Sequence, residues 1–174
     1  MKNIFLKLFI LLFMVVPFIS IAQEKNKMVY DNESEKNILI GAFNQQSLKD
    51  EICSEWYIPE YDNYVVDDMV LEDLELIDFQ NSVINIIMGT WCSDSQREIP
   101  RFYKILEYLE FDMDNVKSIA VDRNKEAPGM QISRLNIEKV PTFIFYLDNK
   151  EIGRIIESPE NSLEHDIVKM YLNK

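Results

Sequence analysis

The stretch Gly89-Thr90-Trp91-Cys92-Ser93-Asp94-Ser95 decides the fold. It follows an almost continuous apolar run, Val83–Met88, which has the length and composition of a strand buried on both faces. After it, apolar residues recur at helical spacing over 99–109. Cys92 therefore lies at a helix N-terminus, where free backbone N–H groups and partial positive charge favour the nucleophilic thiolate. We expect Cys92 to be reactive; the alternative is a buried, inert cysteine.

Two neighbours of Cys92 act on its sulfur in opposite directions. Ser95 lies three residues on, about one helical turn away, where its hydroxyl can donate a hydrogen bond to the thiolate. Asp94 suits a helix N-terminus but disfavours a second negative charge on the sulfur. Arg97 is either a positive charge near the sulfur or a solvated helix residue. The sequence therefore leaves the sign of the thiol's pKa shift open.

The rest of the second half alternates strands and helices. Pro100 lies inside the helix after Cys92 and predicts a kink there. The order strand, helix, strand, followed by a hairpin and a helix, predicts an α/β domain with a mixed central sheet flanked by helices. The elements expected after the first helix are a strand at 116–121, a charged connection at 123–139 with room for one short helix, a strand pair at 142–147 and 151–157, and a closing helix at 162–172.

These features resemble the thioredoxin family. Trp91-Cys92-x-x-Ser95 follows an apolar strand, and Pro100 comes eight residues after Cys92, as the helix proline of thioredoxins does. Val140-Pro141-Thr142 is similar to the family's cis-proline loop, and a strand pair follows it. The resemblance implies a thioredoxin-like fold with Cys92 and Ser95 as catalytic residues. It also implies that substrate is bound by Trp91, Val140, Pro141 and Thr142. Within the family, the chain particularly resembles secreted bacterial proteins that carry Trp-Cys-Ser-Asp-Ser.

Two positions depart from the dithiol members of the family. Ser95 replaces the second, resolving cysteine, and Ile86 replaces the buried acid that many thioredoxins place six residues before the nucleophile. A lone thiolate can still form a mixed disulfide, but its release needs a small thiol, a second substrate thiol or Cys53. We therefore expect a monothiol protein of thiol–disulfide exchange acting on protein thiols and disulfides or small thiols.

Two other interpretations stay open. The chain is alternatively a redox-inactive binding module that holds a client or an envelope partner. A third hypothesis is a structural disulfide between Cys53 and Cys92, the two cysteines of the chain. For Cys53 itself we favour a small buried apolar residue over a resolving thiol.

The first 22 residues have the three-part layout of a secretory signal peptide. Lys2 and Lys7 precede the apolar run 8–19, and the small residues Ser20 and Ala22 stand before Gln23. We expect export across the inner membrane to the periplasm, with no stable membrane insertion after cleavage. An uncleaved anchor is the competing interpretation.

The remaining chain divides into three expected parts. Residues 23–37 form a flexible lead-in, 38–80 a helical acidic extension and 81–174 the thioredoxin-like domain. Within the extension, residues 38–41 are either a short strand or the start of ordered structure, and a helix over 45–56 should end before Pro59. A second, amphipathic helix over 66–77 has an acidic face, which we interpret as solvated in preference to an interaction surface.

Charge and composition exclude several classes of partner. Without Lys2 and Lys7, 16 basic residues face 30 acidic ones, a net charge of −14. This charge argues against binding to nucleic acid or anionic lipid. A single histidine and two distant cysteines provide no zinc-ligand spacing, so we expect neither a metal nor another cofactor. The oligomeric state stays open.

Overall fold

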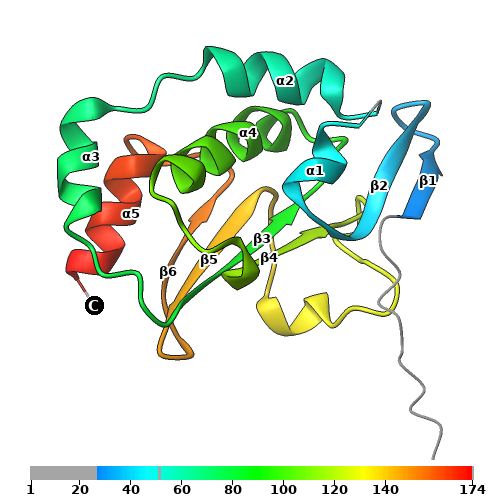
Figure 1. Cartoon of the computed structure of the whole chain (residues 1–174). Coiled ribbons are helices and arrows are strands. Elements are labelled where there is room, and N and C mark those ends of the chain that lie inside the picture. The colour runs from blue at the N-terminus through cyan, green and yellow to red at the C-terminus, as the bar shows by residue number, and fades with distance from the viewer. Residues whose placement is uncertain (1–26, 51, 174) are drawn as a thin grey trace, which may run out of the picture.

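One mixed sheet organises the molecule. The structure, a computed structural model, describes residues 27–50 and 52–173. The strands are ordered β1-β2-β4-β3-β5-β6; β3 and β4 are parallel, and the other neighbouring pairs are antiparallel (Figure 1). Their bounds are β1 (Lys27–Asp31), β2 (Lys36–Phe43), β3 (Ser82–Met88), β4 (Val116–Ala120), β5 (Thr142–Leu147) and β6 (Lys150–Ile156). The expected α/β fold with a mixed sheet flanked by helices is confirmed.

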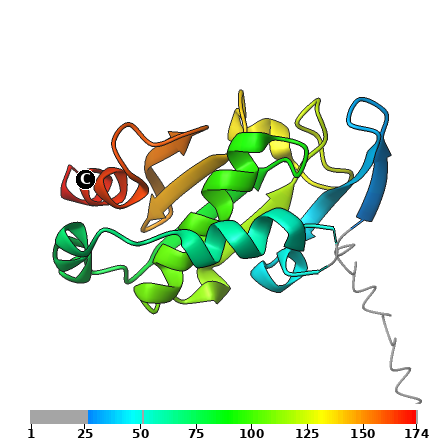
Figure 2. The ribbon, with the colours of Figure 1, turned by 90° about the horizontal axis from the view of Figure 1, so that it is seen from above.

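Helices cover one face of the sheet, and the chain between β4 and β5 covers the other. Figures 1 and 2 show α4 lying across the sheet, with α2 along its outer side and α3 beside α5. The helices are α1 (Gln45–Leu48), α2 (Ser54–Asn63), α3 (Asp68–Glu75), α4 (Ser93–Tyr108) and α5 (Leu163–Leu172). Two short 3-10 helices, η1 (Met113–Asn115) and η2 (Ile132–Leu135), precede β4 and β5 respectively. The predicted short helix within 123–139 is therefore present.

The core follows the alternation of side chains along β3. Ile86 and Met88 belong to the larger hydrophobic cluster under the helices, whereas Ile87 belongs to a smaller cluster on the opposite face. Both faces of β3 are thus covered, as its continuous apolar run predicts. Trp91 and Cys92 pack against the smaller cluster, at the point where β3 passes into α4.

The N-terminal segment differs from the expected flexible lead-in. Residues 27–43 form a β-hairpin, β1–β2, and β2 pairs with β4 in the central sheet. Apolar residues on β2 explain its place, because Ile38, Leu39 and Ile40 are all buried. The expectation of a lead-in is therefore wrong for 27–37, and 38–43 is a strand and not part of a helical extension. The predicted signal peptide, 1–22, and residues 23–26 lie outside the described residues.

The expected helix over 45–56 is also corrected. It is divided into α1 and α2, and Pro59 lies inside α2. The division lets Leu48, Cys53 and Tyr57 all enter the core, whereas Ile52, on the expected apolar face, is 43% exposed. The acidic helix is confirmed as α3, whose buried side is Val70, Leu71 and Leu74. Among residues 27–50 and 52–173, no helix is sufficiently long and apolar to cross a bilayer.

Lys104 of α4 fixes the end of α2 to the domain. Its Nζ donates to the backbone carbonyls of Tyr61 (2.8 Å), Asp62 (3.2 Å) and Tyr64 (2.7 Å), groups that a helix end leaves without intrahelical donors. Arg101 on the same helix pairs with Glu60. The acidic extension is thus held by cations of α4.

A Lys104→Met variant should lose about 1–3 kcal/mol of unfolding free energy, because three carbonyls lose their donor while the aliphatic stem is kept. Urea denaturation followed by circular dichroism measures the change. Lys150→Met, at the exposed start of β6, is the matched control and should be neutral. Equal stability of the two variants would contradict the capping role of Lys104.

Candidate functional site

Cys92 lies where β3 passes into α4 and faces the loop before β5. It is the N-cap of α4, has extended backbone and is half-buried. Its Sγ–H donates a hydrogen bond to the backbone carbonyl of Val140 at 3.2 Å. The Val140–Pro141 peptide bond is cis, so the predicted cis-proline loop is present opposite the thiol. A half-buried thiol at a helix start, beside the cis-proline loop, suits a nucleophile better than it suits a core cysteine.

Hydrogen bonds within the chain hold the cis-proline loop in place. The Thr142 hydroxyl donates to the Lys139 carbonyl at 2.7 Å, and the Glu157 backbone N–H donates to the Pro141 carbonyl at 2.7 Å. The residues Val140, Pro141 and Thr142 are all buried. The Pro141 carbonyl and the Thr142 hydroxyl are thus already paired within the chain.

Ser95 lies deeper than the sequence suggested. Its side chain is fully buried, and its Oγ accepts a hydrogen bond from the Gly89 backbone N–H at 3.3 Å. That bond ties the first turn of α4 to the end of β3. Among the hydrogen bonds of the described residues, none joins Ser95 to the Cys92 sulfur, and the assisting role of this hydroxyl stays a prediction.

Arg97 is engaged by carboxylates. It pairs with Asp94 at 2.9 Å and with Glu98 at 2.7 Å, and it also donates to the Ser158 hydroxyl. These bonds, led by the one to Glu98, raise the pKa of Arg97. Arg97 is therefore neither a free positive charge for the sulfur nor a simply solvated residue.

Cys53 is separated from the site. Both cysteines are free, and Cys53 is 2% exposed in the larger cluster under the helices, whereas Cys92 packs against the smaller one. Burial, with a contribution from the Asp50 carboxylate, raises the pKa of the Cys53 thiol to about 12. A buried thiol that stays protonated is a poor attacking group. This favours the interpretation of Cys53 as a core residue over a resolving or structural partner of Cys92.

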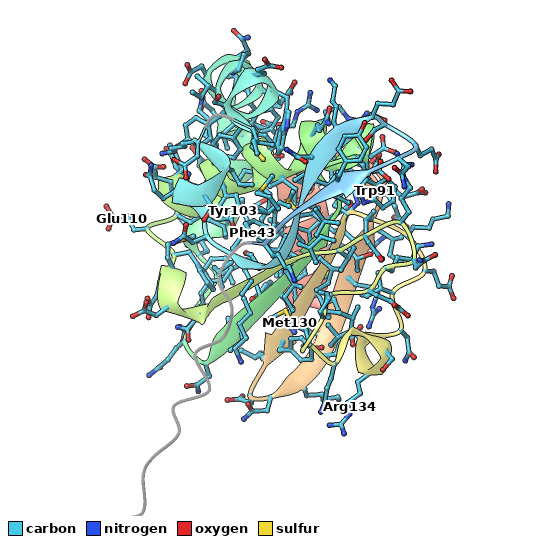
Figure 3. The ribbon with its side chains drawn as sticks, turned by 90° about the vertical axis from the view of Figure 1, so that its right-hand side faces the viewer. Phe43, Trp91, Tyr103, Glu110, Met130 and Arg134 are labelled. Atoms are coloured by element: carbon cyan, nitrogen blue, oxygen red, sulfur yellow. The ribbon has the colours of Figure 1, made fainter. Side chains whose placement is uncertain are left out.

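Trp91, the neighbour of Cys92 in sequence, is held by the chain after β4. Its indole Nε1–H donates to the Val121 backbone carbonyl at 3.0 Å, and the guanidinium carbon of Arg123 lies 4.9 Å from a ring centroid. Figure 3 shows Trp91 on the side of the molecule that carries the β1–β2 hairpin. Sequence reasoning missed Arg123, because it stands in a charged connection without a local pattern. The described residues contain no group of three or more histidine, cysteine or acidic side chains placed to hold a metal ion.

Gly89 makes room for the indole. A Cβ at position 89 would lie 2.5 Å from Cε2 and 2.6 Å from Nε1 of Trp91, well inside contact distance. Trp91 can therefore keep its bond to Val121 only while residue 89 has no side chain.

A Gly89→Ala variant should displace the Trp91 indole and lower the unfolding free energy by about 1–3 kcal/mol through overpacking. Tryptophan fluorescence and thermal melting measure the two effects. Ser93→Ala, at an exposed position of the same turn, is the control and should leave both unchanged. An unshifted Trp91 emission spectrum in Gly89→Ala would show that the position of the indole does not require a glycine at residue 89.

Comparisons with known proteins gave one sequence relative and several solved structures. No family model matches the chain. Thioredoxin H-type 1 of Nicotiana tabacum is 23% identical over 118 residues, which cover 64% of this chain and 78% of that protein. Among solved structures, Fasciola hepatica thioredoxin aligns with a TM-score of 0.39 and 19% identity, over 57% of this chain and 90% of its own. Oxidised thioredoxin O2 of Arabidopsis thaliana aligns with a TM-score of 0.40 and 16% identity, over 59% and 87%. The sequence similarity to the tobacco protein supports a relation to thioredoxins.

Proposed function

We propose that this chain is a monothiol thioredoxin-like protein of thiol–disulfide exchange, in which Cys92 forms mixed disulfides with protein or small-thiol substrates. The observation that carries the proposal is the Cys92 thiol at the start of α4, 3.2 Å from the carbonyl of Val140 in the cis-proline loop. A nucleophile and a substrate-docking edge are thereby placed in contact. The similarity to thioredoxins supports the same reaction class.

The reaction needs one sulfur from the protein. Cys92 loses its proton to water, and the thiolate attacks one sulfur of a substrate disulfide. A new S–S bond to Cys92 forms as the substrate S–S bond breaks, and the leaving thiolate takes up a proton. Loss of the Cys92 proton also frees the Val140 carbonyl, which can then accept a backbone N–H of an extended substrate segment.

Release of the substrate requires a second thiol from outside the site. Ser95 cannot attack a disulfide as a thiolate does, and Cys53 is buried in the larger hydrophobic cluster. A small thiol, or another thiol of the substrate, attacks the mixed disulfide and regenerates Cys92. This chemistry suits isomerisation and removal of thiol caps better than autonomous reduction.

We also propose that the protein works after export, in the periplasm. The support is the signal-peptide pattern of residues 1–22, which lie outside the described residues. Expressing the full chain and finding the protein, with Gln23 as its first residue, in a periplasmic extract would agree with export. A full-length cytoplasmic product would contradict it.

Glutathione disulfide provides a direct test of the proposed chemistry. Wild type and Cys53→Ser should each gain one glutathione by intact-mass spectrometry, and Cys92→Ser should gain none, because only Cys92 is accessible. Dithiothreitol should remove the adduct. A wild-type chain that gains none, while its urea-unfolded form gains glutathione, would contradict the proposal and leave the binding-module alternative.

A further inference from the structure

Arg123 joins the β1–β2 hairpin to the chain that follows β4. Its Nε donates to both carboxylate oxygens of Asp31 at 3.1 Å, and its Nη2 donates to Asp31 Oδ2 at 2.9 Å. Its Nη1 donates to Glu33 in the hairpin turn at 3.1 Å. Such a forked contact fixes the plane of the guanidinium as well as its position.

The same guanidinium also lies over Trp91. Two segments enclose the indole. Arg123 lies 4.9 Å from the ring and Val121 accepts the indole N–H, both in the chain after β4, and Gly89, after β3, lies against the ring atoms. A guanidinium stacks on an indole face by cation–π attraction. The hairpin thus contacts Trp91 indirectly, through Arg123.

The hairpin makes a second contact with the turn before Cys92. The Leu39 backbone N–H donates to the Thr90 hydroxyl at 3.1 Å, and Thr90 is buried. Both residues that precede Cys92 thus depend on the hairpin for their placement.

We propose that Arg123 is a positioning residue that holds the Trp91 indole as a fixed wall beside Cys92 and so directs the approach of a substrate disulfide. The proposal rests on the exchange reaction assigned to Cys92. The Asp31–Arg123 pair is suited to a permanent role, because the guanidinium holds the pKa of Asp31 well below its usual range. Because this pKa is lowered in the folded protein, the Asp31 carboxylate stays ionised even below the unfolded value of about 4, so the contact persists throughout the neutral range.

The test uses a Trp56→Phe background, in which Trp91 is the one tryptophan of the chain. Arg123→Ala should raise the acrylamide quenching constant of Trp91 and slow mixed-disulfide formation with a peptide disulfide, each by about threefold, the value of one cation–π contact. The alkylation rate of Cys92 by iodoacetamide, a small reagent, should change less than twofold. Arg123→Lys keeps a positive charge over the ring but loses the forked contact with Asp31. Its quenching constant and its exchange rate should therefore lie between those of the background and of Arg123→Ala.

Arg134→Ala is the matched control. Arg134 is an exposed arginine on the same connecting segment, and Figure 3 shows it at the end of the molecule away from Trp91. It should behave like the background in every assay. The proposal is overturned if Arg123→Ala matches Arg134→Ala in quenching, or if its exchange and alkylation rates fall by the same factor. If the background forms no mixed disulfide at all, the exchange function fails, whereas the quenching constants still decide whether Arg123 holds Trp91.

Discussion

A Ser95→Cys variant should release a bound substrate from Cys92 without added thiol. Positions 92 and 95 are one turn apart at the start of α4, the arrangement of a Cys-X-X-Cys motif. A second thiol there attacks the mixed disulfide from within the chain, at an effective concentration on the order of millimolar. With roughly 10 µM external glutathione, release should therefore be about 100-fold faster than in wild type.

The measurement is the lifetime of a Cys92 mixed disulfide, followed by intact mass after rapid acid quenching. Ser93→Cys is the control, because Ser93 is exposed and adjacent to Cys92, where an intrachain disulfide is strained. Its mixed disulfide should persist as in wild type. A Ser95→Cys adduct that lasts as long as the control's would show that position 95 is too far from the sulfur for a resolving role.

Replacing Phe102 by alanine should lower the free energy of unfolding by about 3–5 kcal/mol, the range for large buried aromatic residues. Phe102 is fully buried on α4, with its ring 4.4 Å from that of Phe143 and 5.9 Å from that of Phe145, centroid to centroid. It is the main aromatic contact between α4 and β5. Because Cys92 caps α4 and Val140 precedes β5, the same variant should weaken the contact between the thiol and its loop.

Urea denaturation measures the loss, and the glutathione adduct assay measures its effect on the site. Tyr108→Ala removes an aromatic ring from the same helix at a position that is 52% exposed, and should change stability by no more than about 0.5 kcal/mol. A Phe102→Ala variant as stable as Tyr108→Ala would mean that the core closes around the missing ring, and that α4 is not held by this contact.

Local pattern was sufficient for the elements nearest to Cys92. The apolar run of β3, the helical spacing in α4 and the paired strands expected at 142–147 and 151–157 each involve neighbours in sequence, and all of them occur. The placement of Cys92 at a helix start and opposite Val140 also followed from the motif and the loop taken together.

Contacts between segments that are distant in sequence could not be predicted from local patterns. Arg123 gains its role from Asp31, 92 residues away, and from the ring of Trp91. The strand nature of residues 27–31 depends on pairing with β2, since most of β1 is exposed and only weakly apolar. The burial of the Ser95 side chain depends likewise on how α4 packs against the sheet.

The separation in sequence between Cys92 and its loop has a consequence for the order of synthesis. Cys92 and Val140 are 48 residues apart, so translation at about 5–20 residues per second completes the loop some seconds after the thiol has been made. Until then Cys92 is an ordinary cysteine on an unfolded chain, already preceded by Cys53. If such a chain enters an oxidising compartment, Cys92 can form a disulfide with Cys53 before folding has buried Cys53. In the folded protein Cys53 is buried in the larger cluster, and this protection from disulfide exchange begins only when that core has formed.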